Sequence, residues 1–207
     1  MSGPEQNAII LLAAGESSRM GQPKQLLQLR GQSLLRHAAA EAIRSQLGPV
    51  IVVLGAFGEQ MVSELKGLTY SPVLNEQWQE GMGTSIRAGI QFVLQHHPDC
   101  RGAIVMLCDQ PYVDVHHLEK LVHTYHKSHK PIIASAYKGT LGVPAYFHHS
   151  YFELLSQLEG GQGARKLIQQ HAAEAGVVSF PLGGIDVDTP EDYAILKDKI
   201  AREEGIN

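Results

Sequence analysis

Short apolar runs and stretches with helical periodicity alternate along most of this chain. The runs are continuous, have strand length and end at turn-forming residues, which is typical of buried strands. The stretches between them carry apolar residues three and four positions apart, as one face of a helix does. This alternation predicts an α/β fold in which helices cover both faces of a mostly parallel sheet. The expected strands are 8–14, 50–54, 69–74, 103–108, 132–136 and 177–180, and the expected helices are 33–47, 57–66, 84–95 and 114–129.

Two later segments carry more specific signals. Residues 142–147 interrupt the alternation, because the run is short and contains Pro144. Proline has no N–H to donate to a central ladder, so this run is expected to form an edge strand or an antiparallel strand. Thr189 and Pro190 supply an N-cap residue and a first-turn proline, and two acidic residues follow at once. They predict a final helix that begins at Pro190.

Composition limits the classes of function. The 207 residues are 43% hydrophobic and 18% charged, which suits one globular domain over 1–207 with a core within about 8–200. The net charge of −4 provides no broad basic surface, so nucleic acid is not an expected partner and phosphate recognition must be local. No stretch approaches the roughly 18 apolar residues that span a bilayer, and the N-terminus lacks a signal-peptide pattern. We therefore expect a cytoplasmic protein that contacts no membrane.

The cysteines and histidines do not predict a metal site. Cys100 and Cys108 have neither CxxC nor zinc spacing, and both are expected to be buried as small apolar residues. Five histidines crowd one expected helix without an HExxH arrangement or a cysteine partner. A solvated helix face is the better interpretation of these five: His116, His117, His123, His126 and His129.

The first apolar run ends at Gly15, and the loop that follows carries Arg19 and Lys24. In open α/β sheets ligands bind at the carboxyl ends of the strands, and two cations there favour an anionic ligand such as a phosphate. The spacing is not that of a P-loop, because five residues separate Gly15 from Gly21 and the lysine comes later. The dinucleotide fingerprint GxGxxG is absent too, which disfavours a Rossmann dehydrogenase.

Acidic residues stand at the ends of two other expected strands. Asp109 follows the run 103–108 and precedes Gln110 and Pro111, while Asp186 and Asp188 lie two residues apart before the final helix. One or two carboxylates beside phosphates are enough to hold Mg²⁺. The alternative for each aspartate is a turn or helix-capping role. If the chemical interpretation is right, these separated segments must converge with Lys24 around one nucleotide.

A glycine-rich turn before the helix at 84–95 is a candidate base-binding element. Bare backbone at Gly81 and Gly83, with the hydroxyl of Ser85, could read the edge of a base. The alternative is a tight turn in which Thr84 or Ser85 caps the helix.

Together these segments resemble a known family. The opening loop reads L-A-A-G-x-S-x-R-M-G-x-x-K, and it is similar to the nucleotide-binding loop of the MobA-like NTP transferases. The later elements "DQP" and "DxDTPEDY" are similar to metal-binding motifs of the same family. The stretch 80–86 is similar to the "EGMGxSL" element of the molybdenum cofactor cytidylyltransferase (MocA-like) subgroup. The resemblance implies a single-domain, three-layer α/β/α nucleotidyltransferase fold, with a mostly parallel Rossmann-like sheet that includes an antiparallel strand. The implied nucleotide-binding residues are Leu12, Ala13, Ala14, Gly15, Ser17, Gly21, Gly81, Gly83 and Ser85.

The resemblance also implies a reaction. CMP would pass from CTP to the phosphate of molybdopterin, with or without bound molybdenum, and pyrophosphate would leave. Arg19, Lys24 and Asp109 would be the catalytic residues, and Asp109 with Asp186 or Asp188 would hold Mg²⁺. A recipient molybdoenzyme would be a further partner.

Two further elements resemble the family's second-substrate motifs. Pro144 lies in a stretch similar to "GxPxxF", and Arg165 lies in one similar to "GDxGAR". Gly161 departs from the second pattern, because an aspartate is expected there.

Several alternatives stay open. Guanylyl-transferring relatives usually show "LAGG", so the methyl group of Ala14 favours cytidine, by at most about 1–3 kcal/mol. A GTP-using guanylyltransferase and a transferase acting on a sugar or polyol phosphate would share the same loop. A non-catalytic molybdopterin carrier or nucleotide sensor is the alternative from another class.

Overall fold

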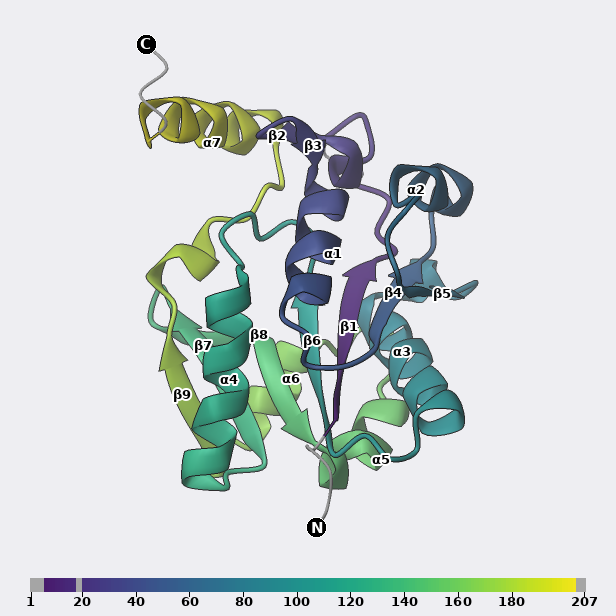
Figure 1. Ribbon diagram of the computed structural model, residues 1–207, viewed down its shortest axis with the longest axis vertical. Helices are drawn as coiled ribbons and strands as arrows, with labels where there is room; N and C mark the ends of the chain where they lie inside the picture. Colours follow the sequence, from purple (N-terminus) through teal and green to yellow (C-terminus); the bar gives the residue numbers. More distant parts are fainter. Residues whose placement is uncertain (1–5, 18–19, 204–207) are drawn as a thin grey trace.

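A seven-stranded sheet forms the centre of the molecule (Figure 1). The computed structural model describes residues 6–17 and 20–203. The strand order is β5-β4-β1-β6-β8-β7-β9, and every strand except β8 runs in the direction of β1. The strands are β1 (Asn7–Ala13), β4 (Val50–Leu54), β5 (Ser71–Leu74), β6 (Gly102–Leu107), β7 (Ile132–Tyr137), β8 (Thr140–His148) and β9 (Ala175–Ser179), with a small separate pair β2 (Gln28–Leu29) and β3 (Gln32–Ser33).

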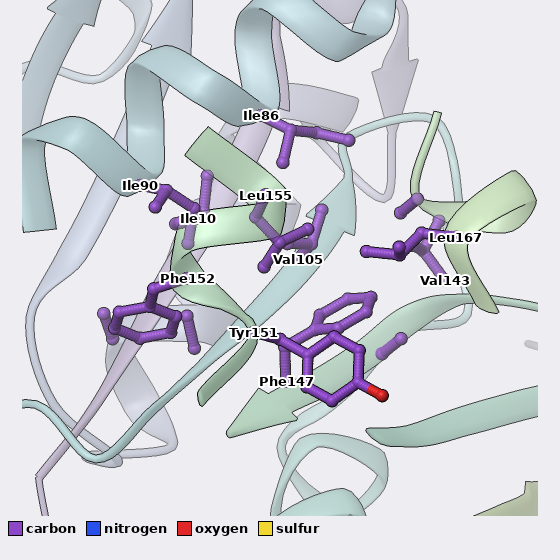
Figure 2. Packing of buried hydrophobic residues seen from close by; sticks show 14 of the residues in the cluster. Ile10, Ile86, Ile90, Val105, Val143, Phe147, Tyr151, Phe152, Leu155 and Leu167 are labelled. Atoms are coloured by element: carbon purple, nitrogen blue, oxygen red, sulfur yellow. The ribbon is translucent and has the colours of Figure 1, made fainter. Parts of the chain in front are cut away.

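Helices cover both faces of this sheet, which gives the three-layer α/β/α fold that the sequence predicts. One hydrophobic cluster joins the sheet to α1 (Leu34–Arg44), α2 (Gly58–Glu64) and α4 (Val115–Ser128). A second cluster joins the opposite face to α3 (Met82–His96), α5 (Phe152–Ser156) and α6 (Ala164–Gln170). Figure 2 shows side chains of α3 and α5 packed beside Ile10 and Val105 of the sheet.

The predicted elements are present, with ends that shift by a few residues. The expected strand 69–74 begins only at Ser71, and the expected helix 33–47 is limited to α1. Local capping explains two helix starts. The Ser33 side chain accepts a hydrogen bond from the Arg36 N–H, and Asp114 accepts one from His117 N–H at the start of α4.

For the segment with Pro144 the sequence predicted an edge strand or an antiparallel strand. The strand is antiparallel, but it does not lie at the sheet edge. β8 lies inside the sheet, between β6 and β7. Proline is tolerated because the register shifts there: Ala134 pairs with Ala145, whereas Ser135 pairs with Gly142. Val143 and Pro144 thus form a bulge, in which a missing N–H interrupts no ladder. Their peptide bond is cis.

The histidine-rich helix α4 gives a correction. His117 is buried, whereas the other four histidines of this segment are exposed as predicted. Its Nε2 lies 2.7 Å from Ser135 Oγ, and its ring stacks on Phe180 at 3.9 Å between centroids. The 3.6-residue helical period points His117 toward the sheet. The prediction that all five histidines lie on a solvated helix face was therefore wrong for His117. Cys100 and Cys108 are buried and free, as expected.

The C-terminal helix α7 (Pro190–Glu203) lies beside β2 and β3 at the top of Figure 1. It begins at Pro190 as predicted, and Thr189 and Asp192 cap it reciprocally. A third hydrophobic cluster holds α7 against the loop after β1, through Leu196, Ile200, Met20 and others. The short helices are η1 (Lys24–Leu26), η2 (Trp78–Glu80), η3 (His149–Tyr151) and η4 (Pro181–Gly184). Within the described ranges, no helix has the length and apolar character to cross a membrane.

Candidate functional site

A cavity of about 300 Å³ opens where β1 and β6 end. Both strands run in the same direction, so their carboxyl ends share one edge of the sheet, where α/β folds bind ligands. Its walls come from the loop after β1, from η2 and the start of α3, and from the end of β6. The lining residues are Leu12, Ala13, Ala14, Gly15, Glu16, Lys24, Gln25, Trp78, Gln79, Gly81, Met82, Ser85, Leu107, Cys108 and Asp109.

A buried glutamine shapes the loop after β1. Gln25 Nε2 donates to the carbonyl oxygens of Ala13 (3.3 Å) and Gly15 (2.6 Å). Ser17 donates its hydroxyl to Gln25 Oε1 at 3.1 Å and accepts a hydrogen bond from Lys24 N–H at 3.0 Å. Ser17 therefore folds the loop back on itself and does not line the cavity. Gly21 has φ +66° in the same loop, a conformation that favours glycine. Arg19 lies outside the described residues.

Lys24 joins the two acidic segments. Its ammonium donates to Asp109 Oδ2 at 2.5 Å and to Asp188 Oδ1 at 2.7 Å. These residues come from η1, from the end of β6 and from the turn before α7, so the expected convergence of separated segments is present in the structure. Lys24 and Asp109 line the cavity at the carboxyl edge of the sheet, and Asp188 joins them through its contact with Lys24.

The electrostatics keep Lys24 charged. Burial by itself lowers the pKa of Lys24, but Asp109 and Asp188 together outweigh it and raise that pKa above the usual range. Burial raises the pKa of Asp109, with Asp188 and Asp186 acting in the same direction and Lys24 opposing them. Two carboxylates thus contact one ammonium, and Asp186 adds negative charge within electrostatic reach of Asp109, an arrangement that favours additional positive charge.

The two aspartates before α7 differ in placement. Asp186 is exposed, whereas Asp188 is half-buried and contacts Lys24. Buried Val187 separates them, and its N–H donates to the carbonyl oxygen of Asp109 at 3.2 Å. No three His, Cys, Asp or Glu side chains in the described part of the chain are arranged to enclose a metal ion. The three predicted carboxylates therefore do not form a preformed cage.

The glycine-rich turn before α3 packs against the loop 159–162. Gly83 N–H donates to the carbonyl oxygen of Gly160 at 3.2 Å, so this amide is already used inside the protein. Gly81 and Ser85 do line the cavity, while Gly83 does not. Neither Thr84 nor Ser85 caps α3, because the N-cap residue is Gly81.

This close approach leads to a prediction about two adjacent glycines. A Cβ on Gly160 would lie 2.0 Å from the carbonyl oxygen of Glu80, whereas one on Gly161 would have no neighbour within 4 Å. We expect Gly160→Ala to reduce the free energy of unfolding by about 1–3 kcal/mol, because backbone must move against backbone. Gly161→Ala should change it by less than about 0.5 kcal/mol. Urea denaturation measures both, and equal losses would contradict the packing described.

The expected second-substrate residues lie apart from this cavity. Pro144 is buried within β8, and its carbonyl oxygen accepts the Ser135 hydroxyl at 2.5 Å, so it offers no surface to a ligand there. Arg165 is exposed at the start of α6 and donates to Thr140 Oγ1 at 3.0 Å.

Sequence reasoning missed three polar residues that hold the site together. Gln25 ties the loop to β1, as described above. Gln110 Nε2 donates to the carbonyl oxygens of Val143 and Gly183, each at 3.0 Å, and so links the residue after Asp109 to β8 and η4. Asn75 Nδ2 donates to the hydroxyl groups of Thr84 and Ser85. The sequence offered only one signal for these three residues, namely that each is an amide side chain directly after a motif residue or a strand end.

A sequence profile described as the MobA-like NTP transferase domain matches residues 9–175. The chain belongs to the MobA-like NTP transferase family. The matched region of this MobA-like chain contains the loop after β1, Lys24 and Asp109, while Asp186 and Asp188 follow it. The family makes the chain a nucleotidyltransferase.

Relatives of this MobA-like chain carry different names. It is 32% identical over 200 residues to the purine catabolism protein PucB of Bacillus subtilis, covering 91% of this chain and 94% of the relative. It is 31% identical over 202 residues to the nicotine blue oxidoreductase of Paenarthrobacter nicotinovorans, covering 90% and 95%.

The fold of the MobA-like chain is similar to solved structures of mycobacterial proteins. A homologue of Rv0371c from Mycobacterium sp. strain JC1 superimposes with a TM-score of 0.83 at 27% identity, covering 95% of this chain and 97% of the other. Rv0371c of Mycobacterium tuberculosis, solved in complex with manganese, gives a TM-score of 0.74 at 26% identity, covering 93% and 98%.

Proposed function

We propose that this protein transfers CMP from CTP to the phosphate of molybdopterin, with or without bound molybdenum, and releases pyrophosphate. The observation that carries the proposal is the placement of Lys24 between Asp109 and Asp188, beside the cavity formed by the family's nucleotide-binding loop. A recipient molybdoenzyme is the proposed partner for the product.

The residues present fit a divalent metal ion. Asp109 Oδ1 is buried and has no hydrogen-bond partner among the described residues, while Oδ2 contacts Lys24. A buried carboxylate oxygen without a partner is costly, and a cation would satisfy it. We propose Asp109 and Asp188 as the carboxylates that hold Mg²⁺, with Asp186 contributing charge from the surface. The complex of Rv0371c with manganese supports a divalent ion in this family.

The proposed reaction needs charge neutralisation more than a base. A phosphate monoester has a second pKa of about 6, so most of the acceptor is already a dianion at neutral pH. Its oxygen attacks the α-phosphorus, the bond from that phosphorus to the bridging oxygen breaks, and pyrophosphate leaves with the electron pair. Lys24 and Arg19 would bind the phosphates and stabilise the negative charge that develops on the leaving group. Mg²⁺, when bound, supplies Lewis-acid stabilisation of the same charge.

The proposed base preference depends on one methyl group. Ala14 is buried and lines the cavity, where a glycine would leave more room. We expect Ala14→Gly to raise kcat/KM for GTP relative to CTP by about tenfold, within the 10–200-fold that one methylene is worth. Steady-state pyrophosphate release with each nucleotide measures the ratio. An unchanged ratio would contradict Ala14 as the selective residue.

The deciding experiment combines the protein with Mg²⁺, each of the four ribonucleoside triphosphates and molybdopterin, and measures pyrophosphate. We expect release with CTP and none without the acceptor. Release with GTP alone would replace the base assignment, and release only with sugar or polyol phosphates would replace the acceptor. No release with any combination would favour a carrier or sensor.

An oxidoreductase is a second candidate because of the relative named for nicotine blue. The lack of the GxGxxG dinucleotide fingerprint opposes an oxidoreductase activity. Hydride transfer would also require neither Lys24 nor the two carboxylates that it contacts. Oxidation of NADH or NADPH with a quinonoid dye, followed at 340 nm, provides the test in the same preparation.

A further inference from the structure

Asn75 is a buried amide that directly follows β5, at the carboxyl edge of the sheet. Its N–H continues the ladder by donating to the carbonyl oxygen of Leu54 at 2.8 Å. Asn75 does not line the cavity at the ends of β1 and β6, which we call the site cavity, but it contacts Ser85, which does. Asn75 can therefore act on a bound nucleotide only through another residue.

One backbone contact fixes which way the Asn75 amide points. Gln77 N–H donates to Asn75 Oδ1 at 3.0 Å, and a backbone N–H can only donate. This contact identifies the oxygen of the amide, so Nδ2 must point the other way, toward α3. There Nδ2 donates to Thr84 Oγ1 at 2.8 Å and to Ser85 Oγ at 2.9 Å, which uses both of its protons.

The amide in turn sets the roles of the two hydroxyl groups. Each accepts from Nδ2, so each can use its own proton only on another acceptor. Thr84 donates its proton within the protein, to the carbonyl oxygens of Gln77 (3.0 Å) and Gly81 (2.9 Å). Ser85, in contrast, has no acceptor for its hydroxyl proton among the residues that the structure describes. Because Ser85 lines the site cavity, its hydroxyl is left to donate into that cavity.

We propose that Asn75 is a positioning residue that helps to select the base, because it holds the Ser85 hydroxyl as a hydrogen-bond donor toward the site cavity. This inference rests on the proposed function, in which the site cavity holds CTP. On the Watson–Crick edge, by which bases are read, cytosine presents N3 and O2 as acceptors, whereas guanine presents N1–H and N2–H₂ as donors. A fixed donor pairs with cytosine and opposes guanine. The polarity of one hydroxyl thus adds to the selection by the room beside Ala14.

The test measures nucleotide binding and needs no acceptor. Trp78 is the single tryptophan of the chain and lines the site cavity, so quenching of its fluorescence reports the Kd of each nucleotide in the presence of Mg²⁺. The readout is the ratio of the Kd for GTP to the Kd for CTP. A change that is only structural, or that only adds charge, weakens both nucleotides and leaves this ratio as it is.

Two substitutions act on the donor in different ways. Ser85→Ala removes it, whereas Asn75→Asp reverses it, because a carboxylate accepts the Ser85 proton. We expect each to lower the ratio about tenfold, through weaker binding of CTP. The double variant should lower it no further, since Asn75 acts through Ser85. Gln77→Glu is the matched control, which should keep the wild-type ratio: it makes the same change of amide to carboxylate two residues away, on an exposed side chain that contacts Arg87 and does not line the cavity.

A second variant covers the case in which Asn75→Asp does not fold, which thermal unfolding checks. Asn75→Ala buries no charge and leaves the Ser85 hydroxyl without a fixed role, so the ratio should fall here as well. A wild-type ratio in the folded Asn75 variants, a further fall in the double variant, or a fall with Gln77→Glu would each overturn the inference, even if the protein releases pyrophosphate as proposed. The proposed function is decided separately, by turnover with molybdopterin.

Discussion

Replacing Lys24 by glutamine should lower the rate of pyrophosphate release about 10²–10³-fold, or about 3–4 kcal/mol of transition-state stabilisation. Glutamine keeps most of the length of the side chain but removes the ammonium that contacts Asp109 and Asp188. The effect should appear in kcat, because the charge on the leaving pyrophosphate is greatest in the transition state. Single-turnover measurement of pyrophosphate with saturating CTP, molybdopterin and Mg²⁺ tests this.

Two comparisons make the Lys24 result interpretable. Lys66→Gln removes an exposed lysine far along the chain and should leave the rate unchanged. Thermal unfolding with Mg²⁺ present checks that Lys24→Gln is still folded, since the substitution leaves two carboxylates facing each other. A folded variant with nearly full activity would assign Lys24 a purely structural role and remove the main support for the proposed mechanism.

Acidification should destabilise the protein through His117. Burial lowers the pKa of His117 to about 4, from 6.5 for a histidine in water. Below pH 6.5 His117 becomes protonated in the unfolded chain, whereas in the folded protein it stays neutral until about pH 4. The free energy of unfolding therefore falls as the pH drops from 6.5 to 4. At 1.36 kcal/mol per pKa unit, the loss between pH 7 and pH 4 is about 3 kcal/mol. Urea denaturation at several pH values measures it.

The contribution of His117 is isolated by substitution. In His117→Phe the aromatic contact with Phe180 is retained and the titration is removed, so the fall in stability with acid should be smaller by about 3 kcal/mol. His123→Gln alters an exposed histidine on the same helix and should follow the wild-type curve. A wild-type slope in His117→Phe would show that other groups cause the acid sensitivity.

The Ser135 hydroxyl is hydrogen-bonded to His117 and to the carbonyl oxygen of Pro144, so His117 also supports the bulge of β8.

The sequence predicted the fold well because its signals are local. A continuous apolar run, a helical period and an N-cap residue such as Asp114 depend only on neighbours within a few positions, and each was found with small shifts at the ends. The family resemblance pointed to Lys24, Asp109 and Asp188, each within a short motif, and their roles in catalysis and metal binding stay predictions.

Only the tertiary structure decided how these motifs meet. Lys24 contacts carboxylates 85 and 164 positions away along the chain, and no local pattern shows that its ammonium lies between them. Pro144 lies inside the sheet because the bulge in β8 leaves no ladder hydrogen bond that would need its N–H. His117 is buried against the sheet, although four neighbouring histidines of the same segment are exposed. The glycines at 83 and 160 are needed because two distant backbones touch. Spacing along the chain determined which elements form, whereas packing between distant elements determined which polar groups are buried and which charges are paired.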